Sequence, residues 1–164
     1  MSFNSNDNSE KDNFGFKIRK INQSDCYFHA IYFLDNITGS LLISKQYSEN
    51  TKTSSNGDLI SGFLNALNLF IKEIRPGETD EEIQEINFRE TRILYERLGR
   101  LSVIAITKKL NLKFERHLLH YIINDFYSRY ESSINHFNGI IEPSILNYEK
   151  KLEMLNYYNS HFEL

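Results

Sequence analysis

One stretch of sequence decides the fold: residues 86–107 read INFRETRILYERLGRLSVIAIT. Apolar and polar residues alternate through Ile83–Phe88 and Arg92–Leu98, as they do in strands with one buried face. Leu101–Thr107 is apolar at nearly every position, which is typical of a central strand that is covered on both faces. The connections between these segments are short enough for hairpins. These residues therefore predict three consecutive antiparallel strands.

Two strands and a helix are predicted upstream of this stretch. Cys26–Leu34 is largely apolar or aromatic, and Ser40–Gln46 follows it across the turn formers Asp35–Gly39, so the pair predicts a hairpin. Leu59–Ile74 has the apolar period of a helix, which ends at Arg75-Pro76-Gly77. Its core-facing stripe is predicted to contain Leu59, Ile60, Phe63, Leu64, Leu67, Phe70, Ile71 and Ile74.

The C-terminal third predicts helices. A helical period starts near Glu115, and Asn138-Gly139 suits its end. Pro143 suits the first turn of a last helix, which is predicted to reach Tyr157-Tyr158. The order of elements is β-β-α-β-β-β-α-α. It predicts an α+β fold with a five-stranded antiparallel sheet, one helix on one face and two on the other.

Composition limits the class of protein. The chain has 164 residues and a net charge of -3, which fits one domain and argues against a dedicated nucleic-acid binder. Its single cysteine, Cys26, excludes an internal disulfide and fits a cytoplasmic location. No apolar run is long enough to span a bilayer. Residues 1–13 predict a disordered tail, residues 14–164 a single domain, and Phe14–Ile21 an extended segment at its start.

The sequence holds no phosphate-binding, dinucleotide-binding or hydrolase motif. We therefore expect no enzymatic activity and no cofactor. His117 and His120 lie three apart on a predicted helix, close to Glu115, but a zinc site needs further ligands. Asp125 and His136 are too far along the chain to supply them, so we expect surface histidines and no metal.

Three other groups of reactive or charged residues have simpler explanations. Cys26 and His29 are expected on opposite sides of a strand, so Cys26 is predicted to be a buried structural thiol. The acidic run at Glu78, Asp80, Glu81 and Glu82 lacks the pattern of a calcium loop. The basic stretch contains Lys108, Lys109, Lys113 and Arg116. It could touch acidic lipids or a partner's acidic face, although a solvated strand end is the simpler interpretation.

One face of the predicted middle helix is small and nearly uncharged. It contains Ser61, Gly62, Asn65, Ala66, Asn68 and Lys72. Interface centres are depleted of charge and small residues permit close approach, so this face is predicted to pack against a second subunit. The alternative is that asparagine is simply common in this chain. Asn65→Arg is predicted to abolish association but preserve the fold.

The second strand offers a further contact of the same kind. Leu41 and Ile43 are predicted on a strand at the sheet edge, where an apolar strand can pair with another chain.

Three phrases carry a family resemblance: FLDNITGSLLISKQYS (33–48), GDLISGFLNALNLFIKEI (57–74) and residues 86–107. With the element order, they resemble the longin, or SNARE-like, domain, and in particular the longin-type proteins of Asgard archaea. The resemblance spans about Cys26 to Tyr158. Phe14–Asp25 departs from it by preceding the expected first strand.

The resemblance implies a non-enzymatic platform. Longin domains pair with one another, and such pairs bind small GTPases or act in their exchange. The implied partners are a small GTPase, a second longin- or roadblock-type subunit, or both, in a homo- or heterodimer of a trafficking-like system. Any membrane contact is expected to be peripheral and made through partners. The alternative is a profilin- or PAS-like sensor whose aromatic interior lines a small-molecule pocket.

Overall fold

The computed structural model describes residues 18–20, 27–47, 57–74, 77, 83–154 and 158–160. The strands are β1 (Ile18–Lys20), β2 (Phe28–Asp35), β3 (Leu41–Gln46), β4 (Glu85–Asn87), β5 (Arg92–Leu98), β6 (Leu101–Thr107) and β7 (Tyr158–Ser160). The helices are α1 (Gly57–Ile74), α2 (Leu112–Asn135), α3 (Pro143–Leu146) and α4 (Tyr148–Met154).

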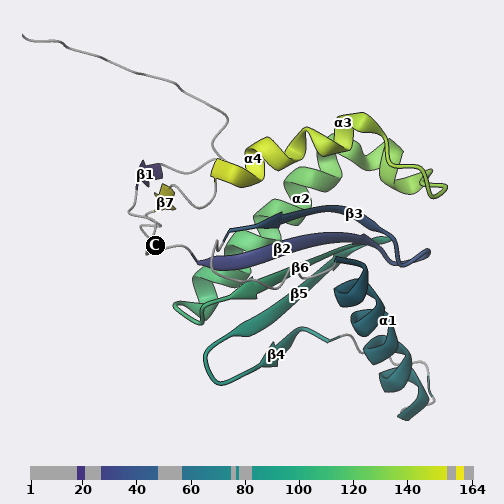
Figure 1. Ribbon diagram of the computed structural model, residues 1–164, viewed down its shortest axis with the longest axis horizontal. Coiled ribbons are helices and arrows are strands. Elements are labelled where there is room, and N and C mark those ends of the chain that lie inside the picture. Colours follow the sequence, from purple (N-terminus) through teal and green to yellow (C-terminus); the bar gives the residue numbers. More distant parts are fainter. Residues whose placement is uncertain are drawn as a thin grey trace, which may run out of the picture.

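Five strands form one antiparallel sheet in the order β3-β2-β6-β5-β4 (Figure 1). This confirms the predicted α+β architecture. In the central strand β6, Ile104 pairs in register with Tyr32 of β2 and with Tyr95 of β5. Leu101–Ala105 is buried on both faces of the sheet, which explains why this segment has no polar face.

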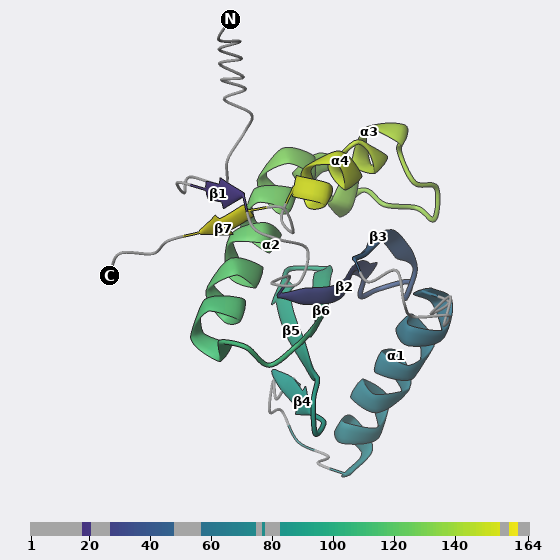
Figure 2. The same ribbon diagram turned by 60° about the vertical axis from the view of Figure 1, so that its left-hand side comes forward.

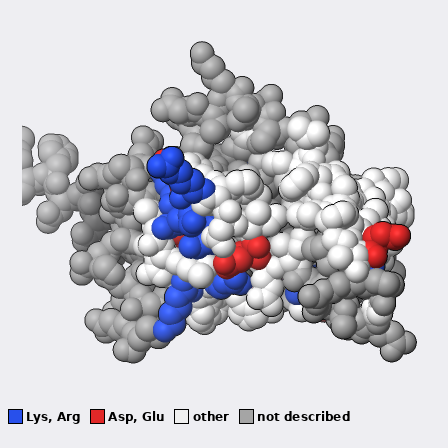
Figure 3. All heavy atoms as spheres, turned by 90° about the horizontal axis from the view of Figure 1, so that it is seen from below, with Lys and Arg blue, Asp and Glu red and all other residues white. Residues whose placement is uncertain are grey.

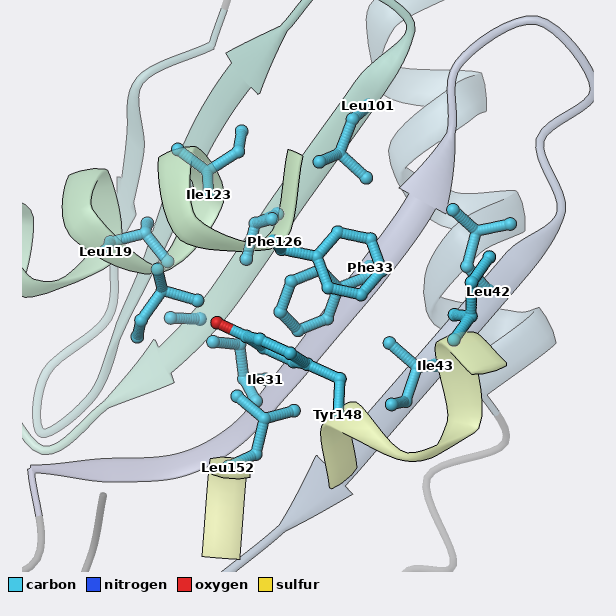
Figure 4. Close-up of a cluster of buried hydrophobic side chains, with 14 of the residues drawn as sticks. Ile31, Phe33, Leu42, Ile43, Leu101, Leu119, Ile123, Phe126, Tyr148 and Leu152 are labelled. Carbon is cyan, nitrogen blue, oxygen red and sulfur yellow. The ribbon is translucent and has the colours of Figure 1, made fainter. Parts of the chain in front are cut away.

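The main core lies between the sheet and the C-terminal helices. Helix α2 begins where the side chain of Asn111 accepts a hydrogen bond from the backbone N–H of Phe114 (3.1 Å), and it packs on β5 and β6. The rings of Phe33, Phe126 and Tyr148 pack against one another, with centroids 4.5 to 5.8 Å apart (Figure 4). Aromatic side chains that could have lined a ligand pocket therefore pack as core here.

A smaller apolar cluster lies on the opposite face of the sheet. Tyr32, Tyr95 and Ile104 contribute to it from the three central strands, and Leu64 contributes from α1. Helix α1 lies on this face, with one end beside β3 at the sheet edge (Figure 2). The sheet is thus sandwiched as predicted, with one helix on one face.

Two tight connections depend on glycine. Gly39, after the first strand of the β2–β3 hairpin, has φ +73°, and Gly99, between β5 and β6, has φ +60°. Both values lie in the left-handed region, which glycine adopts without steric cost. The hairpins predicted from the turn residues are confirmed.

The chain ends differ from the prediction. β1 pairs with β7, so that Ile18 lies opposite Ser160. The predicted last helix is wrong at its end, because α4 stops at Met154 and Tyr158 begins a strand. Tyrosine suits a strand as well as a helix, and the pairing with β1 is a tertiary effect that local periodicity does not report. The predicted tail, residues 1–13, lies outside the described residues.

Candidate functional site

Helix α1 presents four of the eight residues of its predicted apolar stripe to solvent. Leu64 is 3% exposed, whereas the side chains of four other stripe residues are between 55% and 73% exposed. Those four are Leu59, Phe63, Phe70 and Ile74. With Ala66, which is also exposed, they follow the spacing i, i+4, i+7, i+11, i+15 and lie on one face of the helix. We call these five residues the α1 stripe.

The prediction that the eight apolar residues of this helix face the core is therefore wrong for four of them, Leu59, Phe63, Phe70 and Ile74. Among the described side chains of helix α1, Leu64 is buried and Ile60 is partly buried in the smaller cluster on the sheet. Among the strands, the contacts of α1 concentrate on β3 at the sheet edge. Periodicity identifies an apolar face, but it does not distinguish a face that covers a core from one that is left open to a partner.

The α1 surface is nearly devoid of charge. The helix carries Asp58, Lys72 and Glu73 as its only ionisable residues. Figure 3, which views the molecule from below, shows most of its Lys and Arg side chains on the left, away from the side where α1 lies. An exposed helix face normally carries many charges, so an apolar and uncharged one resembles the centre of an interface.

The face that the sequence predicts as the partner site adjoins this stripe and shares Ala66 with it. Gly62 and Ala66 are exposed, as is Lys72. A Cβ built on Gly39 would lie 2.3 Å from Nδ2 of Asn65, so the Asn65 side chain packs closely on the β2–β3 turn. The side chains of Ser61 and Asn68 lie outside the described part of the helix. Contact of this face with a partner stays a prediction.

Strand β3 is at the sheet edge, as predicted. The side chain of Leu41 is half-buried, whereas Leu42 and Ile43 are buried in the main core, on the side where α3 and α4 contact β3. Ile43 is thus a core residue, and its contribution to any partner contact would come from its main chain.

Two buried ion pairs fix the elements around these surfaces. Arg100 donates to both carboxylate oxygens of Asp35 (2.5 and 3.0 Å) and to the backbone carbonyls of Asn135 and Phe137, which ties the hairpin turns to the end of α2. Burial alone would raise the pKa of Asp35, but hydrogen bonds from Arg100 and Thr38 outweigh it and hold that pKa below its usual range. The pair is therefore a structural tie between these turns and α2.

The second ion pair joins Arg92 of β5 to Glu115 of α2 (2.9 Å). Glu115 is fully buried, and it also accepts hydrogen bonds from the Thr107 hydroxyl and from the backbone N–H groups of Leu110 and Asn111. The sequence suggested Glu115 as a neighbour of two histidines. Its role in the structure is to close the β6–α2 turn.

The histidines of α2 are exposed. His120 Nδ1 lies 3.0 Å from Oε1 of Glu96, and His117 stacks edge-on against Tyr121. Within the described ranges, no three His, Cys, Asp or Glu side chains gather as metal ligands would. Cys26 and the acidic run at residues 78–82 lie outside those ranges.

No described helix is both long and apolar enough to cross a bilayer. No protein-family model matches the sequence, and no curated protein matches it. Among solved structures, the fold is similar to that of MglB from Myxococcus xanthus, with a TM-score of 0.50 and 20% sequence identity. The match covers 64% of this chain and 85% of MglB. The fold is accordingly longin- or roadblock-like, and the Asgard-archaeal type stays a prediction.

Proposed function

We propose that this chain is a non-enzymatic, cytoplasmic binding module that pairs with a second longin-type chain and, as a pair, engages a small GTPase in a trafficking-like system. One observation carries the proposal, namely the exposed and uncharged α1 stripe on a longin-like fold. The family resemblance of the sequence supports the GTPase, and the similarity to MglB supports the fold on which that resemblance depends.

The α1 stripe has the shape of a helix-packing seam. The spacing of Leu59, Phe63, Ala66 and Phe70 repeats every three or four residues, so two such helices can interdigitate along their length. Gly62 and Ala66 lie beside the large side chains and allow close approach, because a Cβ at Gly62 would meet nothing within 4 Å. We place the partner's helix along this seam, with β3 at its margin.

Two arginine substitutions on the same helix test the interface. Phe63→Arg places a charge within the α1 stripe, whereas Asn65→Arg places one on the neighbouring face predicted from the sequence. Sedimentation velocity of the wild-type chain is expected to show a dimer, and Phe63→Arg is expected to show a monomer with an unchanged circular dichroism spectrum. A dimer lost in Asn65→Arg but kept in Phe63→Arg would move the interface to the other face.

The GTPase is tested separately. Purified dimer is titrated with small GTPases of the same organism, each loaded with GDP or with a non-hydrolysable GTP analogue. The proposal expects one GTPase to bind with a preference for one nucleotide state, and it expects Phe63→Arg to weaken that binding. A wild-type chain that binds none of them would refute this part and leave the pairing intact.

A further inference from the structure

Two turns lie side by side at one end of the sheet. The first, Phe88–Thr91, precedes β5, and the second, Lys108–Asn111, follows β6. Because Arg92 pairs with Thr107 in the antiparallel register, these turns emerge next to each other. Nζ of Lys109 donates a hydrogen bond to the backbone carbonyl of Phe88 (2.8 Å), which joins them directly.

The second turn has a fixed conformation. The carboxylate of Glu115, which is buried beneath this turn, accepts hydrogen bonds from the backbone N–H groups of Leu110 (3.0 Å) and Asn111 (3.2 Å). Lys109 has φ +57°. This value lies in the left-handed region of the backbone, which residues other than glycine and asparagine rarely adopt. Such strain persists only where surrounding contacts hold it, and it concentrates at functional sites.

This end of the sheet exposes apolar and basic side chains together. Phe88 is 51% exposed and Leu110 is 57% exposed. Arg89 and Lys113 are exposed and Lys108 is half-buried. Lys and Arg form a band on the left of Figure 3, the side on which Figure 1 shows these turns. The basic turn surface is Phe88, Arg89, Lys108, Lys109, Leu110 and Lys113. Glu90 is the one acidic residue within the two turns.

This mixture indicates which kind of partner the surface fits. A solvated strand end gains nothing from exposing Phe88 and Leu110. The centre of a protein interface is depleted of lysine, so a protein partner suits the apolar residues better than the basic ones. An anionic bilayer suits both, because basic groups are attracted to its headgroups and apolar side chains reach the acyl boundary.

We propose that the basic turn surface docks directly on an anionic lipid bilayer. Phe88 and Leu110 enter the interface between headgroups and acyl chains, while Arg89, Lys108 and Lys113 remain among the lipid phosphates. Lys109 holds the two turns together so that both apolar side chains face the same plane. This contact is independent of the α1 stripe and of the proposed GTPase partner.

Vesicle sedimentation tests the docking. The full chain is mixed with vesicles of phosphatidylcholine, alone or with phosphatidylserine. Binding is expected only to the anionic vesicles and is expected to weaken as salt is raised. Arg89→Gln with Lys113→Gln is expected to lower the partition coefficient about tenfold or more, since each basic residue near the surface contributes about 1 kcal/mol. Phe88→Ser with Leu110→Ser is expected to lower it by a similar factor.

Matched controls lie elsewhere on the surface. Lys150→Gln removes an exposed charge from α4, and Ile140→Ser removes an exposed apolar side chain from the α2–α3 connection. Both are expected to bind as the wild type does. The chain contains no tryptophan, so Phe88→Trp supplies a single fluorophore whose emission should shift to the blue on anionic vesicles, whereas Ile140→Trp should not shift.

Several results would overturn the proposal. These are no binding of the wild type to anionic vesicles, binding that survives both double substitutions, and a Phe88→Trp emission that does not move. The first result would favour an acidic protein face as the occupant. All variants are compared by circular dichroism, so that a loss of binding is not a loss of fold.

Discussion

Neighbouring residues of α1 should respond very differently to truncation. Leu64 is buried in the smaller cluster, so Leu64→Ala removes packed methyl groups, leaves a cavity and is expected to cost about 3 kcal/mol in unfolding free energy. Phe63, the preceding residue, is more than half exposed. Phe63→Ala is expected to cost about 1 kcal/mol, because little area is returned to water and alanine favours the helix.

Urea denaturation at successive protein concentrations measures both costs. At dilutions where sedimentation shows monomer, the expected order is wild type, then Phe63→Ala, then Leu64→Ala. As the concentration rises, pairing should stabilise the wild type and Leu64→Ala but stabilise Phe63→Ala much less. A monomeric Phe63→Ala that is as unstable as Leu64→Ala would refute the reasoning, since the α1 stripe would then face the core.

Substitutions at three further residues, His29, Glu115 and Tyr148, test the rest of the structure. Burial, and then the charge of Lys108, lower the pKa of His29, so its neutral form is favoured in the fold and its contribution to stability is lost as pH falls below the ordinary value of 6.5. His29→Leu should flatten the fall in melting temperature between about pH 7.5 and about pH 5, and an unchanged slope would contradict this. Glu115→Ala should cost about 3–5 kcal/mol in urea denaturation, because it leaves the Arg92 charge buried and unpaired, while Glu115→Gln should cost less. Tyr148→Phe removes a hydrogen bond to Asp125 (2.8 Å) and should lower the unfolding free energy by about 1–2 kcal/mol; an unchanged melting temperature would show that this bond adds nothing.

Most of the sheet could be predicted from the sequence because its signals are local. The alternation in Arg92–Leu98, the unbroken apolar run Leu101–Thr107 and the turn at Gly99 each specify a strand or a hairpin without distant partners. The hairpin signal also places β3 next to β2, and the structure has β3 at the sheet edge as predicted. The pairing of β1 with β7 joins residues far apart in the chain, and no local pattern reports it.

The partner face predicted from the sequence and the exposed α1 stripe lie on the same helix, and contact of either with a partner stays a prediction. The sequence marks α1 through its low charge. It assigned Phe63 and Phe70 to the core because an apolar helix face is alike in a core and in an interface. The width of the apolar face of α1 was a clue that part of it is exposed, because one side of a helix is enough to cover the edge of a sheet. The sequence also marks the basic stretch at residues 108–116. Local patterns do not place Phe88 beside it, because the two turns are brought together by the register of β5 and β6.

The antiparallel pairing of β1 with β7 determines how the chain would respond to mechanical load. Ile18 lies opposite Ser160, so a force that pulls the two termini apart acts on one end of this short ladder. Its hydrogen bonds would then open one after another, at low force, before tension reached the five-stranded sheet. Pulling the chain by its ends in an optical trap should therefore give a small early extension followed by a larger cooperative one. A single step would show that the ladder and the sheet yield together.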